Sequence, residues 1–140
     1  MIKQLIGTLV AGSSGLPYDF GDKGWQNLQA DEQASEFVWL LDPVQFNFVD
    51  TTFMQESYPV VIMFLKKTKL DATPQQLDAA TDAMRMHVRS FVNYAVSQKQ
   101  LVKAITDLRS IEIHHALDAD YSGWMLYATI QPYATESTCY

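Results

Sequence analysis

Residues 73–97 read TPQQLDAATDAMRMHVRSFVNYAVS, and this stretch organises the rest of the chain. Thr73 followed by Pro74 is typical of a helix start, because a threonine side chain caps free backbone N–H groups and proline suits the first helical position. Aspartates lie toward the start of the stretch and arginines toward its end, as the helix dipole favours. Apolar residues recur every three or four positions, at Leu77, Ala80, Met84, Val88, Phe91 and Ala95. The pattern predicts one amphipathic helix over residues 74–97.

Three strands are predicted before this helix. Residues 36–41 (EFVWLL) are rich in aliphatic and aromatic side chains and stop at an Asp-Pro pair. Residues 44–49 (VQFNFV) alternate between apolar and polar side chains, which indicates a strand with one buried and one wet face. Residues 58–65 (YPVVIMFL) are apolar throughout, so we expect a strand covered on both faces. Pro59 should sit at its beginning or on an edge, because proline cannot donate to a strand ladder.

The two ends of the chain carry further elements. Residues 2–11 repeat their apolar side chains at helical spacing, which predicts a short amphipathic helix. Residues 100–107 are expected to add a short turn of helix. Residues 111–116 and 123–130 both alternate, and the Asp/Ser/Gly-containing loop 118–123 lies between them, so they are predicted to form an antiparallel hairpin.

The order of helix, strands, helix and strands predicts an α+β fold. We expect a mostly antiparallel sheet packed against the long helix at about 74–97 and the short N-terminal helix. With 140 residues, the chain has the length of about one domain. That domain is predicted over residues 1–132, followed by a polar tail at 133–140.

A glycine-rich segment over residues 12–24 is predicted to be a long loop or arm. It carries Tyr18 and Phe20, and Trp25 follows it directly. These aromatic side chains either fold back onto the domain or plug into a neighbouring subunit, and folding back is the favoured alternative. If they do meet a neighbour, they are candidate interface residues, because aromatic side chains concentrate binding energy.

The net charge of −6 is unevenly distributed along the chain. Residues 1–60 carry −6, residues 61–110 carry +4 and residues 111–140 carry −4. An acidic chain is poorly suited to gripping a phosphate backbone, so the basic cluster of Lys66, Lys67 and Lys69 is better explained as a solvated strand end or a contact with an acidic neighbour. The uneven charge is explained either by several solvated faces that serve only solubility, which is the favoured alternative, or by one acidic and one basic face, which would favour head-to-tail contacts between identical copies.

Residues of catalytic type do not form a recognisable site. His114 and His115 precede Asp118 and Asp120, but adjacent strand residues point to opposite faces, which leaves at most a weak two-ligand metal site. The aspartates resemble the front of a calcium loop, yet Thr129 stands where that loop needs a glutamate. The single cysteine, Cys139, excludes an internal disulfide. We therefore predict no catalytic or metal site from these residues.

The order of elements resembles small head–tail connector proteins of tailed bacteriophages, the tail terminator and tail completion group. The resemblance covers residues 1–132 and depends on a strand opening at Tyr58-Pro59, the long helix opening at Pro74, and a last strand beginning with residues 120–124 (DYSGW). It implies a sheet flanked by helices and a homo-oligomeric ring, often six-fold, that binds other neck or tail proteins. It also implies no catalysis and no cofactor, and a place in the virion after synthesis in the host cytoplasm, with DNA at most passing through a lumen.

The sequence therefore predicts a non-enzymatic structural subunit of a phage neck that acts by assembling into a ring. Two other functions stay open. One is a small bacterial accessory domain that binds a ligand or a protein as a monomer or dimer. The other, ranked last, is a metal-dependent hydrolase that uses the histidines and aspartates of residues 114–120. No membrane association is expected, because no apolar run approaches the length of a membrane span.

Overall fold

The long helix is present with the predicted bounds, as α3 over Pro74–Ser97. Its first turn is closed by a reciprocal pair of hydrogen bonds. The Thr73 hydroxyl oxygen accepts from the Gln76 backbone N–H at 3.2 Å, and the Gln76 side chain accepts from the Thr73 N–H at 2.9 Å. This capping box satisfies two backbone donors that a helix start otherwise leaves free. The computed structural model describes residues 2–21, 36–41, 44–52, 54–68, 71–116 and 121–133, with only the backbone at 115 and 116.

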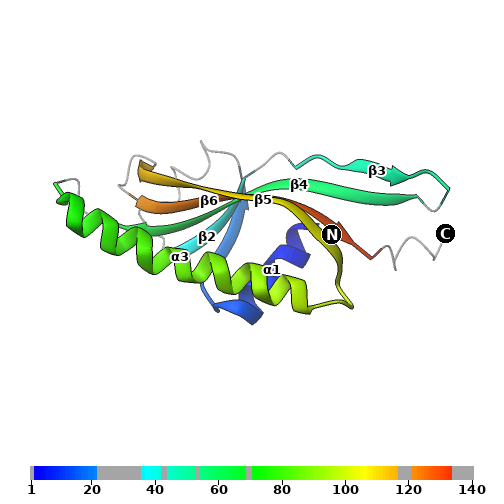
Figure 1. Ribbon diagram of the computed structural model, residues 1–140, viewed down its shortest axis with the longest axis horizontal. Helices are drawn as coiled ribbons and strands as arrows, with labels where there is room; N and C mark the ends of the chain where they lie inside the picture. The colour runs from blue at the N-terminus through cyan, green and yellow to red at the C-terminus, as the bar shows by residue number, and fades with distance from the viewer. Residues whose placement is uncertain are drawn as a thin grey trace.

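Six strands of the described residues form one mostly antiparallel sheet, so the fold is α+β (Figure 1). The strand order is β1-β2-β4-β6-β5, and β3 pairs with β4 off this path. Only the pairing of β1 with β2 is parallel. The remaining elements are α1 (Ile2–Ser13), β1 (Tyr18–Gly21), β2 (Glu36–Leu41), β3 (Asn47–Asp50), β4 (Gln55–Lys67), β5 (Val102–Ala116) and β6 (Tyr121–Pro132).

Both helices lie on the same side of the sheet, and the main core lies between them and the strands (Figure 1). The predicted apolar stripe of α3 is buried there, except that Leu77 is only partly covered. Phe91 of α3 packs edge-on against Phe64 of β4, with ring centroids 5.7 Å apart. The Trp124 indole of β6 donates to the backbone oxygen of Thr81 at 2.7 Å. Apolar packing and this hydrogen bond together fix α3 on the sheet.

The opposite face of the sheet also has buried side chains, at the end where β2 lies. They form a second cluster that consists of Phe37, Trp39, Met63, Leu65 and Tyr121. The rings of Phe37 and Tyr121 meet edge-on at 4.9 Å. The Trp39 indole donates to the Gly21 backbone oxygen at 3.0 Å. The prediction that the apolar run of β4 is covered on both faces is therefore confirmed for residues 62–65.

Two predicted boundaries at the C-terminal half are wrong. Residues 102–107 belong to β5 and are not a helical turn, because they pair with the end of β6. The strand β6 begins at Tyr121, so Gly123 lies inside the strand and not in the loop. The hairpin itself is confirmed, with strands much longer than predicted. Long-range pairing extends both strands beyond the stretches where the alternation is visible.

The N-terminal half also differs from expectation. Residues 12 and 13 finish helix α1, and residues 18–21 form strand β1, so these parts of the predicted glycine-rich loop are regular structure. The strand predicted at 44–49 begins only at Asn47. Pro59 is the fifth residue of β4, not an end residue. The alternative of an edge position holds locally, because the pairing of β4 with β3 ends at Ser57 and its pairing with β2 begins only at Ile62.

Candidate assembly interface

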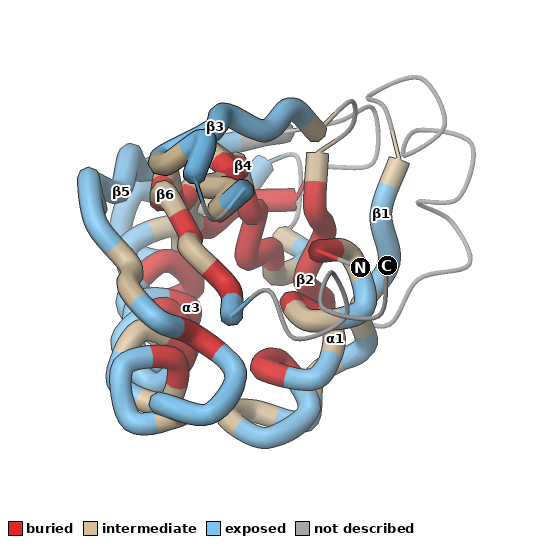
Figure 2. Tube along the Cα trace, turned by 90° about the vertical axis from the view of Figure 1, so that its right-hand side faces the viewer, coloured by how far each residue is buried: buried red, intermediate tan, exposed pale blue. Residues whose placement is uncertain are grey.

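The hairpin formed by β3 and the start of β4 reaches past the main sheet (Figure 1). Residues 55–57 of β4 pair with β3, and pairing with β6 begins only at Tyr58. We call residues 44–52 and 54–58 the hairpin arm. The trace of β3 is mostly exposed, in contrast to the buried β2 (Figure 2). Four large apolar side chains of the arm are at least half exposed, at Phe46 (50%), Phe48 (50%), Val49 (55%) and Met54 (53%), whereas Val44 is partly buried and Tyr58 is buried.

The prediction of a buried apolar face on residues 44–49 is therefore wrong for Phe46 and Phe48, whereas Val44 is partly buried and packs against the main core. Phe46 and Phe48 do share one side, as the alternation indicates, and their rings pack edge-on with centroids 5.5 Å apart. Phe46 also meets the ring of Tyr58 at 5.9 Å. Tyr58 is itself buried in the main core, but Phe46 and Phe48 each keep half of their surface exposed.

Polar contacts hold the arm in a defined position. Gln55 Oε1 accepts hydrogen bonds from Lys103 Nζ at 2.9 Å and from Gln131 Nε2 at 3.0 Å, which join the arm to β5 and β6. The Tyr58 hydroxyl donates to the Glu56 carboxylate at 2.6 Å. Burial, together with this hydrogen bond and the nearby negative charge, raises the pKa of Tyr58 to about 12. The arm is thus an ordered projection with an apolar side.

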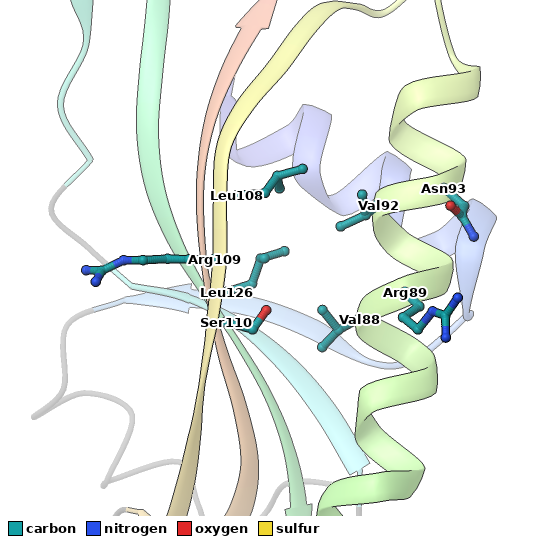
Figure 3. A pocket seen from close by; sticks show the side chains of 8 residues that line it. All are labelled: Val88, Arg89, Val92, Asn93, Leu108, Arg109, Ser110 and Leu126. Carbon is teal, nitrogen blue, oxygen red and sulfur yellow. The ribbon is translucent and has the colours of Figure 1, made fainter.

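A second feature is a groove between α3 and β5, with a volume of about 390 Å³. Figure 3 shows four apolar side chains that converge in it from the helix and the sheet: Val88, Val92, Leu108 and Leu126. Arg89 and Asn93 point away from the strand and form its outer rim (Figure 3). Arg109 contributes backbone, because its side chain lies on the other face of the sheet, where the guanidinium stacks 4.4 Å over the Tyr127 ring.

The aromatic residues predicted near the N-terminus fold back where they are described. The Tyr18 hydroxyl donates to the Lys3 backbone oxygen at 2.8 Å, and its ring packs against the main core. Phe20 stays 37% exposed, with Lys3 Nζ 4.8 Å from its ring centre. Trp25 lies outside the described residues, as do residues 22–24 of the glycine-rich segment. Tyr18 is therefore a structural residue of the domain, and Phe20 is a surface residue.

The predicted basic cluster lies elsewhere. Lys66 and Lys67 end β4 and line a hollow of about 310 Å³ beside the first turns of α3, and Lys69 is outside the described residues. Phe20 of β1 is paired with Leu40 of β2, and Leu40 is paired with Ile62 of β4. Phe20 is therefore level with a position of β4 that lies four residues before Lys66. The structure therefore does not bring the described aromatic and basic candidates together.

The residues considered for metal binding do not assemble in the part of the chain that the structure describes. His114 contacts the carboxylate of Glu112, and His87 lies 3.5 Å from that of Glu36, so each imidazole meets one acidic residue. The described residues contain no group of three or more potential metal ligands. The His115 side chain, Asp118, Asp120 and Cys139 lie outside the described part. The described helices include none that is both long enough and apolar enough to cross a membrane.

Sequence reasoning missed both the arm and the groove. The signal for the arm was present in the polar, turn-forming residues 50–52, which follow a short alternating strand and precede a second one. The groove depends on how α3 crosses β5, which no local pattern reveals. Compared with known proteins, the chain matches no protein-family model and no curated protein.

Proposed function

We propose that this protein is a structural subunit of a tailed-bacteriophage neck, a tail terminator or head–tail connector, that works by assembling into a ring. The observation that carries the proposal is the hairpin arm, an ordered projection with four exposed apolar side chains. The rings of Phe46 and Phe48 pack together on it, and exposed apolar surface of this kind is typical of protein–protein contact sites. The phage context comes from the resemblance in the order of elements, and the α+β architecture agrees with it.

The alternative function, binding of a small ligand by a monomer or dimer, has one observation in its favour. The groove between α3 and β5 is apolar and open to solvent. Ligand sites, however, usually combine apolar walls with several converging polar groups. Inside this groove the polar side chain that converges with the apolar ones is that of Ser110 (Figure 3).

The test is the assembly state of the full chain. Light scattering across protein and salt concentrations gives the mass, and negative-stain electron microscopy gives the symmetry. We expect a ring with a central opening. A chain that stays monomeric at the highest concentration, or that stops at a two-fold dimer, would contradict the proposal and favour the accessory domain. Portal, terminase or tail-tube genes beside its gene would support the phage assignment independently.

A further inference from the structure

We infer that the hairpin arm of one copy docks into the α3–β5 groove of a second copy, with Phe48 and its apolar neighbours as the inserted side chains. This inference rests on the proposed function, because it names the contact by which the subunits join. It deepens that proposal by assigning the two halves of the interface to residues of different elements. The partner is a second copy of this chain.

The two surfaces match in apolar character. The arm offers aromatic and aliphatic side chains that its own domain leaves half exposed. The groove is lined by Val88 and Val92 of α3 and by Leu108 of β5, and Leu108 is 42% exposed. A volume of about 390 Å³ is many times the share of one water molecule, which is about 30 Å³ in the liquid. The groove therefore has room for an aromatic ring and its neighbours.

The charges of the two surfaces are also complementary. Residues 44–58 contain two acids, Asp50 and Glu56, and no lysine or arginine. The groove residues include Arg89 at the rim and no acid. In the described part of the chain, no carboxylate forms an ion pair with Arg89. Because two arms carry the same sign of charge, an arm-to-arm contact is disfavoured, whereas an arm-to-groove contact pairs opposite signs.

The positions of the two surfaces set the geometry. The arm projects beyond one end of the sheet, and the groove lies between α3 and the edge strand β5 (Figures 1 and 3). A contact between different surfaces of identical copies is head-to-tail, and it closes into a ring when the rotation allows. Three bulges interrupt β5, so a long edge-to-edge ladder is disfavoured. We therefore expect the arm to bind the groove through its side chains, and not by adding a strand to the edge of β5.

The test is selective disulfide formation between two variants mixed in equal amounts, in a Cys139→Ser background. One variant carries Phe48→Cys on the arm and the other Leu108→Cys in the groove. The matched control replaces the groove variant with Met86→Cys, which lies on α3 and is 57% exposed. In a glutathione redox buffer we expect the arm–groove dimer to exceed the arm–Met86 dimer by about tenfold, the selectivity of a specific contact over random collision. Circular dichroism checks that each variant is folded.

A second measurement uses the assembly state itself. Phe48→Ser, at an exposed position, should weaken self-association by about tenfold or more, as expected for an aromatic anchor, and Met86→Ser should not. Arg89→Glu should weaken it as well, and Arg89→Lys should restore part of the loss.

The outcomes separate this inference from the proposed function. If the chain forms rings but the arm–groove disulfide does not exceed its control, the inference is wrong and the ring proposal stands. A predominant Phe48→Cys homodimer would show arm-to-arm pairing and overturn the inference. If the chain is monomeric yet the arm–groove disulfide is selective, the contact is real and the ring proposal fails. A monomer without a selective disulfide overturns both.

Discussion

Gly123 shows how a single missing side chain permits the pairing of two central strands. It lies in β6 opposite Leu65 of β4. A Cβ atom built on it would lie 1.9 Å from the backbone oxygen of Phe64, far inside contact distance. Because that obstacle is backbone, it cannot rotate away. Glycine is therefore required by the close approach of the two strands.

We predict that Gly123→Ala lowers the free energy of unfolding by about 3 kcal/mol or more, at or beyond the upper end of ordinary overpacking. Urea denaturation followed by circular dichroism measures it. Gly12→Ala is the matched comparison, because its Cβ would meet the Tyr94 ring at 2.3 Å, and a side chain can move aside. A gain in helix propensity of up to about 1 kcal/mol offsets part of that clash. Equal losses in the two variants would contradict the backbone argument.

At the scale of elements, the bulges of β5 decide which side chains face the helices. Ile105 and Ile113 are an even number of residues apart, so a regular strand would place them on one face. Ile105 packs in the main core, whereas Ile113 packs in the second cluster on the opposite face. The register gains one residue between Thr106 and Arg109, where Asp107 adopts a φ of 56°. This bulge also turns Arg109 away from the groove.

The capping box of α3 leads to a prediction at the same scale. Thr73→Ala removes the hydroxyl that accepts from Gln76 and should lower the free energy of unfolding by about 1 kcal/mol. Ser90→Ala, at an exposed position in the middle of α3, is the control and should change stability by less than about 0.5 kcal/mol. Chemical denaturation of both variants measures the difference. No loss for Thr73→Ala would mean that the helix start draws its stability from packing alone.

At the scale of the whole molecule, the sheet is buried on both faces at one end and carries the arm at the other. The strand β4 runs through both regions, with consecutive residues Ile62 and Met63 fully buried on opposite faces. Its first residues belong to the hairpin arm. One strand therefore joins the core to the surface proposed for assembly.

If the side chains on both faces of the sheet belong to the core, truncating Ile62 on one face or Met63 on the other should be similarly destabilising. Ile62→Ala and Met63→Ala should each lower the free energy of unfolding by about 2–5 kcal/mol. Val61→Ala, at a half-buried position of the same strand, should lower it by clearly less. Thermal or urea unfolding measures all three. A loss for Met63→Ala no larger than that for Val61→Ala would show that the second cluster contributes little to stability.

Local patterns were sufficient for the elements that depend on local chemistry. The bounds of α3 follow from its cap, its proline and its apolar spacing, and those of β2 from a short apolar run that stops before an Asp-Pro pair. The expected antiparallel hairpin at residues 111–130 is present for the same reason. Each of these signals comes from residues that are neighbours in the chain, so the interactions that select the structure can be inferred from the sequence.

The amino-acid sequence by itself determined the fold class, the long helix and the strands of the core, because periodicity and capping act over a few residues. Only the tertiary structure decided that Phe46 and Phe48 stay exposed, since alternation predicts that a face is apolar but not that anything covers it. Tertiary structure also set the bulges of β5 and the groove beside α3. Both depend on how distant segments meet, and no local pattern encodes that meeting.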